Sequence, residues 1–571
     1  MLDAMTSITP ANLSPYYYRD NFLRLCESVE GQYGDLLSES EQHFLQTIRQ
    51  VPFEAQCLYV RLVSRSANWF RESQLNYQEL GDTAGALDDL LEAGLLACAT
   101  QLSLEDAAKL FTVAELRAGF ASHIHAAGQA SGQAHSRTLR KSDLLNLLET
   151  LALPATEVAR ALQSCDPGRW VTPVSQAQVA LLQLLFFGNR YQSLTDFILQ
   201  DIGVVTYYPY ALSRERRLFP NRAALDEHIL CLALMDEYYA RLQADDSAGL
   251  LELAALALQQ RLAHASSMKR WSALCNRLGR ELERRQAPTL ALALYEQSHR
   301  HPGRERRARI LEQQGEHAAA LQLCQDMLAA PWCEAEVDNA TRIAARLQRK
   351  LGAAAVKRPV DTFDELRLQL APCELSVESL VAHHLAPDWH CVRVVENRLI
   401  NTLFALAFWE QIFAPLPGAF SHPYQSIPHD MYSADFYTSR KAMLEQRIDE
   451  LATGDLTETL VSAYHQYHNY QCRWLHPRAV DAQLVADACT AIPAQDLIAI
   501  WRRMLFDPKE NRRGLPDLLA LGTRVGDYCM IEVKAPGDRL QDHQKRWLRF
   551  FQRQGIPAQV AWVEWREPDD D

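Results

Sequence analysis

The sequence predicts a mainly α protein, in which helical N-terminal and solenoid regions are followed by a C-terminal α/β domain. Most of the chain has apolar residues at helical spacing, as in the stretch 21–96. Apolar runs of strand length are confined to the last sixty residues, at 515–521, 527–534 and 558–564, and an amphipathic helix ending at Gly555 precedes the last run. A helix, two strands, a helix and a strand form an α/β unit.

The bulk properties of the chain limit the classes of protein to which it can belong. A chain of 571 residues is too long to fold around a single hydrophobic core, and its length suggests about three or four domains. No apolar run approaches the roughly 20 residues of a membrane span, and the N-terminus lacks the pattern of a secretory signal. The 13 cysteines are scattered without a CxxC pair, which argues against a zinc ribbon or a disulfide framework. We therefore expect a cytoplasmic, nucleoid-associated protein without membrane contact.

Shifts in composition divide the chain into four predicted domains. These are a helical N-terminal domain at 1–110, a small helix pair at 111–154, a helical domain rich in Ala, Leu, Gln and Arg at 155–375, and the α/β domain at 376–571. In the second domain, FTVAELRAGF and SRTLRKSDLLNLLE flank a connector rich in Gly, Ala and His. Two short helices, of which the second begins with basic residues, resemble the SAP module, a DNA-binding helix pair. This resemblance makes Lys141 a candidate DNA contact. A plain helical hairpin is the alternative.

The third predicted domain contains an internal similarity. The segment LERRQAPTLALALYEQS, starting at Leu282, matches LEQQGEHAAALQLCQDM, starting at Leu311. Paired helices that repeat near this length resemble a tetratricopeptide (TPR) solenoid, so we call the region TPR-like. Such a solenoid serves as a scaffold, and a concave surface rich in Arg could also follow a phosphate backbone.

The basic charge of the chain is concentrated in a few segments, although the formal net charge is −13. Residues 269–309 carry eleven Lys or Arg and four Glu, a local net charge of +7. A second cluster contains Arg214, Arg216, Arg217 and Arg222, and a third is the segment WRRMLFDPKENRR. Because nucleic-acid binding depends on local patches, these segments permit a DNA partner despite the acidic total.

The stretch GLPDLLALGTRVGDYCMIEVKAPGD, residues 514–538, carries the candidate chemistry. In a hairpin of two strands, Glu532 and Lys534 point to the same side, and antiparallel pairing across TRVGD brings Asp517 close to Glu532. Two adjacent carboxylates suit Mg²⁺ or Mn²⁺, which take oxygen ligands. With a lysine beside them, this set permits phosphodiester hydrolysis. The alternative is a surface salt bridge on a hairpin.

The motif Pro516-Asp517 … Glu532-Val533-Lys534 is the PD-(D/E)xK pattern, and other motifs accompany it. VEN-x₄-TLF-x₄-W-x₂-IF, PYQ-x₂-P-x-D, FYTSR, RGLPDL and EVKAPGDRLQDHQ occur in the C-terminal third. With YYYRDNF, AQCLYVRLVSR and FFGNRYQSLTDFILQDIG further upstream, they make the chain resemble the Fanconi-associated nucleases, whose catalytic part is a VRR-NUC domain. The resemblance implies a structure-specific DNA nuclease that cuts 5′ flaps, trims DNA 5′→3′ and acts in interstrand crosslink repair.

The resemblance also implies roles for individual residues. Glu396, Asp517 and Glu532 are the implied ligands of one or two Mg²⁺ or Mn²⁺ ions, with the backbone carbonyl of Val533 as a further ligand. Lys534 is the implied catalytic lysine, and Gln544 on the following helix supports the site. No Cys/His cluster corresponding to the ubiquitin-binding zinc finger of eukaryotic relatives occurs in the sequence, so ubiquitin recruitment is not implied.

Branched or flapped duplex DNA is the expected partner, and several basic residues are candidates to contact it. They are Arg61, Arg65, Lys141, Arg214, Arg216, Arg217, Lys509, Arg512, Arg539 and His543. Arg71 is a further candidate beside Arg61 and Arg65, and these three arginines could instead lie on solvated helix faces. His543 replaces a lysine of the relatives' pocket for a terminal 5′-phosphate. Two other functions stay open: a four-way-junction resolvase-like nuclease, and a non-catalytic TPR-like scaffold for DNA repair.

Overall fold

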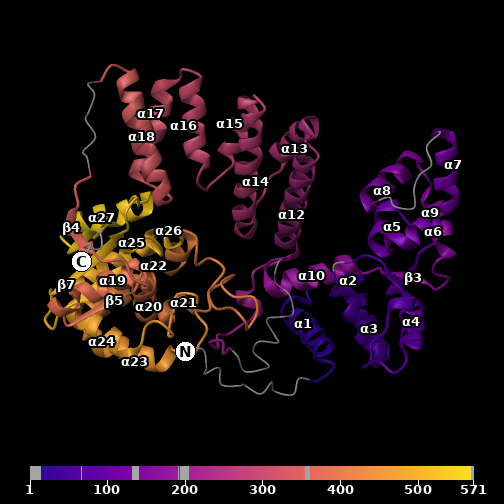
Figure 1. Ribbon diagram of the computed structural model, residues 1–571, viewed down its shortest axis with the longest axis horizontal. Coiled ribbons are helices and arrows are strands. Elements are labelled where there is room, and N and C mark those ends of the chain that lie inside the picture. The colour runs from indigo at the N-terminus through magenta and orange to yellow at the C-terminus, as the bar shows by residue number, and fades with distance from the viewer. Residues whose placement is uncertain are drawn as a thin grey trace, which may run out of the picture. The chain divides into compact units, whose positions relative to one another are not determined.

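The computed structural model describes residues 14–65, 67–131, 140–190, 192, 205–353 and 361–566. It comprises two compact units, Met1–Val204 and Val205–Asp571 (Figure 1). Part of the connector in the predicted SAP-like pair, 132–139, and most of the segment FFGNRYQSLTDFILQDIG, 186–203, lie outside the described residues.

The first unit combines helices with a small antiparallel sheet of order β1-β3-β2. Its elements are α1 (Tyr17–Tyr33), α2 (Glu39–Gln50), α3 (Phe53–Val63), β1 (Phe70–Arg71), η1 (Glu72–Gln74), α4 (Thr83–Glu92), β2 (Leu96–Cys98), α5 (Leu104–Leu110), α6 (Val113–Gly119), α7 (Ala121–Ser131), α8 (Lys141–Thr150), α9 (Ala155–Gln163), β3 (Trp170–Pro173) and α10 (Gln176–Phe187). The prediction that strands are confined to the last sixty residues is therefore wrong. These strands have four residues or fewer, too few for a periodic pattern to reveal them.

The predicted helix pair is present as α6 and α8, and both helices contribute to one hydrophobic cluster. Leu116 of α6 and Leu144 of α8 are fully buried there against α9 and Trp170. A capping box of Thr112 and Glu115 begins α6, because each side chain bonds the other's backbone N–H. The helices are confirmed, while the SAP identity stays a prediction.

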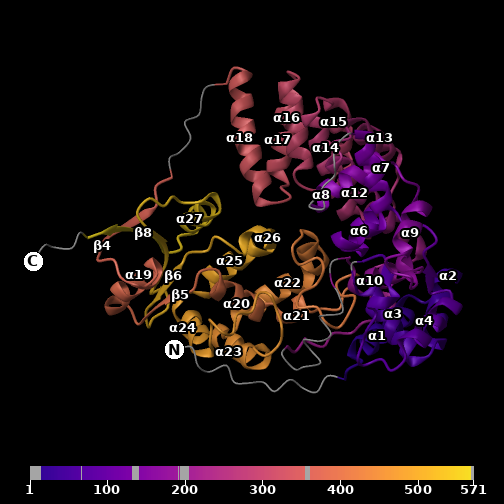
Figure 2. The same cartoon turned by 45° about the vertical axis from the view of Figure 1, so that its right-hand side comes forward.

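The second unit begins with a row of packed helices, which is the arrangement that a solenoid requires; the TPR-like identity stays a prediction. Its elements are η2 (Arg214–Arg216), α12 (Arg222–Gln243), α13 (Ser247–Gln259), α14 (Ala265–Arg284), α15 (Pro288–Glu296), α16 (Gly303–Gln313), α17 (His317–Ala329) and α18 (Glu334–Lys350). Leu282 and Ala291, which belong to the internal similarity, are fully buried between α14 and α15. Helices α16, α17 and α18 lie side by side in both views (Figures 1 and 2).

The rest of the second unit is an α/β domain built on a five-stranded mixed sheet of order β4-β8-β7-β6-β5. Its elements are β4 (Asp364–Leu370), α19 (Val377–Leu385), η3 (Ala386–Asp388), β5 (Cys391–Val394), α20 (Arg398–Ala407), α21 (Trp409–Ile412), α22 (Asp435–Thr453), α23 (Leu456–Tyr467), α24 (Ala482–Ala491), α25 (Ala494–Phe506), α26 (Pro508–Asn511), β6 (Leu518–Leu521), β7 (Tyr528–Lys534), α27 (Asp542–Gln554) and β8 (Ala558–Trp565). Strand β7 pairs antiparallel with β6 and parallel with β8.

Two of these strands, β4 and β5, precede the segments in which strands were predicted. Strand β4 pairs with β8 over its whole length, so the sheet includes residues upstream of the predicted boundary at 376. Its sequence DELRLQL alternates polar and apolar residues, a strand signal that the sequence analysis missed. Strand β5 has only four residues, two of them exposed, and becomes recognisable only through its pairing with β6.

The two faces of the sheet are covered by different helices. Ile531 and Val533 of β7 pack with α19 in one cluster, whereas Met530 belongs to the larger cluster that contains α20, α25 and α27. Because side chains alternate along a strand, Glu532 and Lys534 share the face of Met530. Within the described residues, no single helix is long and apolar enough to cross a membrane. The pair α24 and α25 matches a broken span in length and composition, but it is bent by 109°.

Candidate active site

The sheet brings Asp517 and Glu532 together as predicted. Leu518 pairs with Ile531 in the antiparallel register of β6 and β7, so Asp517, one residue before β6, lies opposite Glu532. The backbone N–H of Val533 donates a hydrogen bond of 2.9 Å to Oδ2 of Asp517. This bond fixes the orientation of the Asp517 carboxylate. The side chain of Glu532, another predicted metal ligand, lies beside that carboxylate.

Lys534 and Gln544 both bind the Glu532 carboxylate. Lys534 donates from Nζ to Oε1 of Glu532 over 2.6 Å, and Gln544 of α27 donates from Nε2 to the same oxygen. The Gln544 amide is also held at its other end, because its Oε1 accepts from the backbone N–H of Gln541 at 2.9 Å. Glu532 is only 1% exposed, so these contacts lie in the interior. The proximity predicted for Asp517, Glu532, Lys534 and Gln544 is confirmed.

The electrostatics of this cluster favour a bound cation. Burial raises the pKa of Glu532 to about 8, and the negative charge of Asp517 adds to the rise, while Lys534 opposes it. Burial also raises the pKa of Asp517. Buried Glu532 and half-buried Asp517 have one lysine between them, so ionising both carboxylates is unfavourable, and a divalent cation with oxygen ligands would relieve their repulsion. The donor set therefore fits Mg²⁺ or Mn²⁺.

Glu396 has a different environment from the other three predicted side chains. Its backbone N–H donates to the carbonyl oxygen of Asp517 at 2.9 Å, but its side chain is exposed and accepts from Asn397 at 3.3 Å. Nowhere in the described ranges do three His, Cys, Asp or Glu side chains come close enough together to hold a metal. The fold thus places the Glu396 backbone beside the site without directing its carboxylate into the pair.

A further carboxylate near the site was missed by the sequence analysis. Glu378, in the first turn of α19, is close enough for its charge to contribute to the raised pKa of Asp517. The available signal was the Ser376 N-cap, which begins a helix between β4 and β5. Without knowledge of the sheet, nothing in the sequence linked that helix to Asp517.

The candidate DNA contacts of the first unit differ in their exposure. Arg71 of β1 is buried between Asp166 and Glu115, so the prediction that it lies at a solvated surface, as a phosphate contact or on a helix face, is wrong. Arg61 forms an ion pair with Glu79 at 2.6 Å and lies over the ring of Tyr18. Arg65 and Lys141 are exposed. The two exposed cations are thus the more accessible candidates.

In the second unit, most of the candidate contacts lie at the surface. The exposed residues are Arg214, Lys509, Arg512 and Arg539, and the half-buried ones are Arg216, Arg217 and His543. The His543 ring packs against Gly514, where a Cβ would lie 2.4 Å from Cδ2 of the ring and where φ is +79°. Glycine is therefore required at the start of the loop that leads to Asp517.

Fold and site together define a nuclease of the PD-(D/E)xK type, a class that uses divalent metal ions. Residues 452–565 match the VRR-NUC domain, and residues 16–97 match the FAN1 HTH domain. The chain is 35% identical to the Fanconi-associated nuclease 1 homolog of Pseudomonas aeruginosa, over 98% of each chain. It is 25% identical to the Arabidopsis thaliana homolog, over 96% of this chain and 67% of that one. This chain belongs to the Fanconi-associated nuclease family.

Solved structures agree with this assignment. The structure of paFAN1 bound to 2nt 5′ flap DNA with gap superposes with a TM-score of 0.83 and 33% identity, over 98% of this chain and 100% of that chain. The match of residues 16–97 to a helix-turn-helix domain adds a feature that the sequence analysis described only as helical.

Proposed function

We propose that this protein hydrolyses phosphodiester bonds in branched or flapped duplex DNA, cutting 5′ flaps and trimming 5′→3′ in interstrand crosslink repair. The observation that carries the proposal is the buried contact of Asp517, Glu532 and Lys534, with Gln544 bound to the same carboxylate. The flap DNA bound to the similar paFAN1 supports the choice of substrate.

Each residue of the site has a separate role in this proposal. Asp517 and Glu532 would bind one or two Mg²⁺ or Mn²⁺ ions, together with the Val533 carbonyl. The backbone of Glu396 lies beside Asp517, so its exposed carboxylate would complete the set by turning towards the pair. A bound ion of this kind polarises the phosphoryl group and lowers the pKa of a ligated water. Lys534 neutralises negative charge that develops on the phosphoryl oxygens.

The basic residues position the DNA rather than select its sequence. Lys509, Arg512, Arg539 and His543 follow or precede the catalytic strands closely in sequence, and we assign them to a terminal 5′-phosphate or its neighbours. Arg61, Arg65 and Lys141, with Arg214, Arg216 and Arg217, contact backbone phosphates of the duplex arms. Such contacts release counterions, so DNA binding should weaken steeply as salt is raised.

Cleavage of an end-labelled 5′-flap duplex tests the proposal. Purified protein should cut near the flap junction in Mg²⁺ or Mn²⁺ and not in EDTA, and Asp517→Ala should abolish cutting while flap binding persists. A mobile four-way junction, assayed in parallel, separates flap cleavage from a resolvase-like activity. Cleavage retained by Asp517→Ala would overturn the site assignment, and tight flap binding without cleavage in either metal would favour the scaffold function.

A further inference from the structure

Arg503 of α25 is a buried cation in the α/β domain. Its side chain is only 7% exposed, and its guanidinium lies over the rings of Trp547 and Phe550 of α27, at 4.8 and 4.9 Å from their centroids. A cation in such a position needs a counter-ion, since an unpaired charge in the interior is strongly destabilising.

The counter-ion comes from the solenoid. Arg503 bonds from Nη2 to Oε1 of Glu334, the first residue of α18, over 3.0 Å. Two more bonds secure Glu334: Asn511 donates from Nδ2 to the same carboxylate at 3.2 Å, and the Glu334 backbone N–H donates to Asp507 at 3.1 Å. The N-terminal turn of α18 is thus fastened to α25 and α26.

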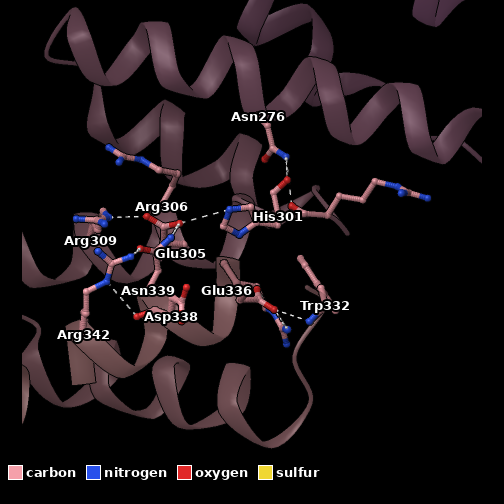
Figure 3. A network of polar contacts seen from close by, with 12 residues as sticks. Asn276, His301, Glu305, Arg306, Arg309, Trp332, Glu336, Asp338, Asn339 and Arg342 are labelled. Atoms are coloured by element: carbon pink, nitrogen blue, oxygen red, sulfur yellow. Dashed lines mark hydrogen bonds and ion pairs between the residues drawn. The ribbon is translucent and has the colours of Figure 1, made fainter. Parts of the chain in front are cut away.

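The same turn of α18 is held firmly within the solenoid (Figure 3). The fully buried carboxylate of Glu336 accepts two bonds from Arg304 of α16 and one of 2.7 Å from the backbone N–H of Trp332. One helical turn on, Asn339 donates to Glu305 of α16 at 2.7 Å. Glu334 therefore meets Arg503 from a helical turn that several hydrogen bonds hold in place, not from a loop.

On its other side, Arg503 contacts the helix that reaches the active site. Trp547 lies beneath the guanidinium and donates from Nε1 to the carbonyl oxygen of Arg513, in the loop that leads to Asp517. Gln544, one turn earlier on α27, donates to the catalytic Glu532. A second ion pair, Arg546 with Asp338 at 3.3 Å, joins α27 to α18 directly.

We propose that Glu334 and Arg503 are positioning residues for the nuclease reaction. The solenoid, through Glu334, sets the position of Arg503 and α27, and thereby of Gln544 against Glu532. This inference rests on the proposed function for the roles of Glu532 and Gln544. It gives the solenoid a part in assembling the active site, in addition to any part in holding DNA.

The test is the single-turnover cleavage rate of full-length Glu334→Gln on saturating 5′-flap DNA in Mg²⁺ or Mn²⁺. Because a displacement of about 1 Å in an active site can cost up to about 100-fold in rate, we expect a loss of about tenfold with flap affinity changed less than about twofold. Glu334→Asp keeps the charge and should retain more activity than Glu334→Gln. If Glu334→Gln does not fold, the rate of Glu334→Asp is compared with that of the wild type instead.

Two comparisons separate positioning from general destabilisation. Glu312→Gln removes a carboxylate of α16 that is only 9% exposed and pairs with Arg346 and Lys350 of α18 rather than with α27. It should leave the rate unchanged when assayed at an equal margin below its own Tm. In a double-mutant cycle, Glu334→Gln combined with Gln544→Ala should be no slower than Gln544→Ala alone, since both changes act through one contact.

An unchanged rate in Glu334→Gln, an equal loss in Glu312→Gln, or fully additive losses with Gln544→Ala would each overturn the inference. Wild-type protein and Asp517→Ala are assayed beside them. If the wild type cuts and Asp517→Ala does not, the proposed function stands whatever the result for Glu334. If the wild type fails to cut, the proposed function fails first.

Discussion

The side chains of Glu312 in the solenoid and Glu532 in the sheet are only 9% and 1% exposed, but their pKa values move in opposite directions. Arg346 and Lys350 bind Glu312 and lower its pKa to about 2. Burial and the neighbouring Asp517 raise the pKa of Glu532 to about 8, even though Lys534 contacts it. Burial alone therefore does not mark a functional carboxylate. An excess of negative charge over nearby cations does, because it leaves a place for a metal ion.

The largest effect that would test the difference between Glu532 and Glu312 is on the rate of flap cleavage. Glu532→Gln keeps the shape of the side chain but removes the charge that binds a cation, so flap cleavage should fall by about 10²- to 10³-fold. The same change removes a buried charge with unfavourable neighbours, so metal-free Glu532→Gln should melt no lower than the wild type at pH 8. Cleavage assays and thermal melts check both parts. A lower Tm together with full activity would show that Glu532 is a structural carboxylate like Glu312.

The next effect is on the pH dependence of stability without metal. Since the folded pKa of Glu532 lies above its unfolded value, the folded state holds an extra proton between about pH 4.5 and 8, and stability falls as pH rises through that window. In EDTA, Tm should therefore decrease from pH 5 to pH 8. Mg²⁺ or Mn²⁺ should raise Tm more at pH 8 than at pH 6, by several degrees, because the ion competes with that proton.

Glu532→Gln is the control for that pH dependence. It should flatten both the decline in Tm and the difference between the metal effects at the two pH values. A wild-type Tm in EDTA that rises steadily from pH 5 to pH 8 would contradict the assignment of a cation-deficient carboxylate pair.

The smallest effect concerns the structural carboxylate. Glu312→Gln should cost about 1–2 kcal/mol of unfolding free energy at pH 7, discounted for the partial exposure of Arg346 and Lys350, with cleavage unchanged. Because its folded pKa is lowered, the contribution of Glu312 is present above about pH 4.5 and is lost as pH falls towards 2. Urea unfolding at pH 7 and pH 3 measures the difference, which should shrink at the lower pH. An equal cost at both pH values would show that charge pairing is not the cause.

The arrangement of Asp517, Glu532 and Lys534 was predictable because it depends on local geometry. The alternation of a strand places Glu532 and Lys534 on one face, and the short turn between β6 and β7 determines which residue faces Asp517. The helix that ends at Gly555 was equally readable, because an amphipathic run and a left-handed glycine mark its end. Strand β4 was missed although its alternation was visible, since nothing local said that it joins β8.

Periodicity and short-range pairing are visible in a sequence, so they predicted the class of fold, the solenoid of paired helices and the carboxylate pair with its lysine. The tertiary structure sets the contacts between residues that are distant in the chain. It buried Arg71 against Asp166, left the Glu396 carboxylate exposed, brought Glu378 towards Asp517, and paired Arg503 with Glu334 of the solenoid. These contacts join residues far apart in the chain, and their energies depend on burial and neighbouring charge, which no local pattern records.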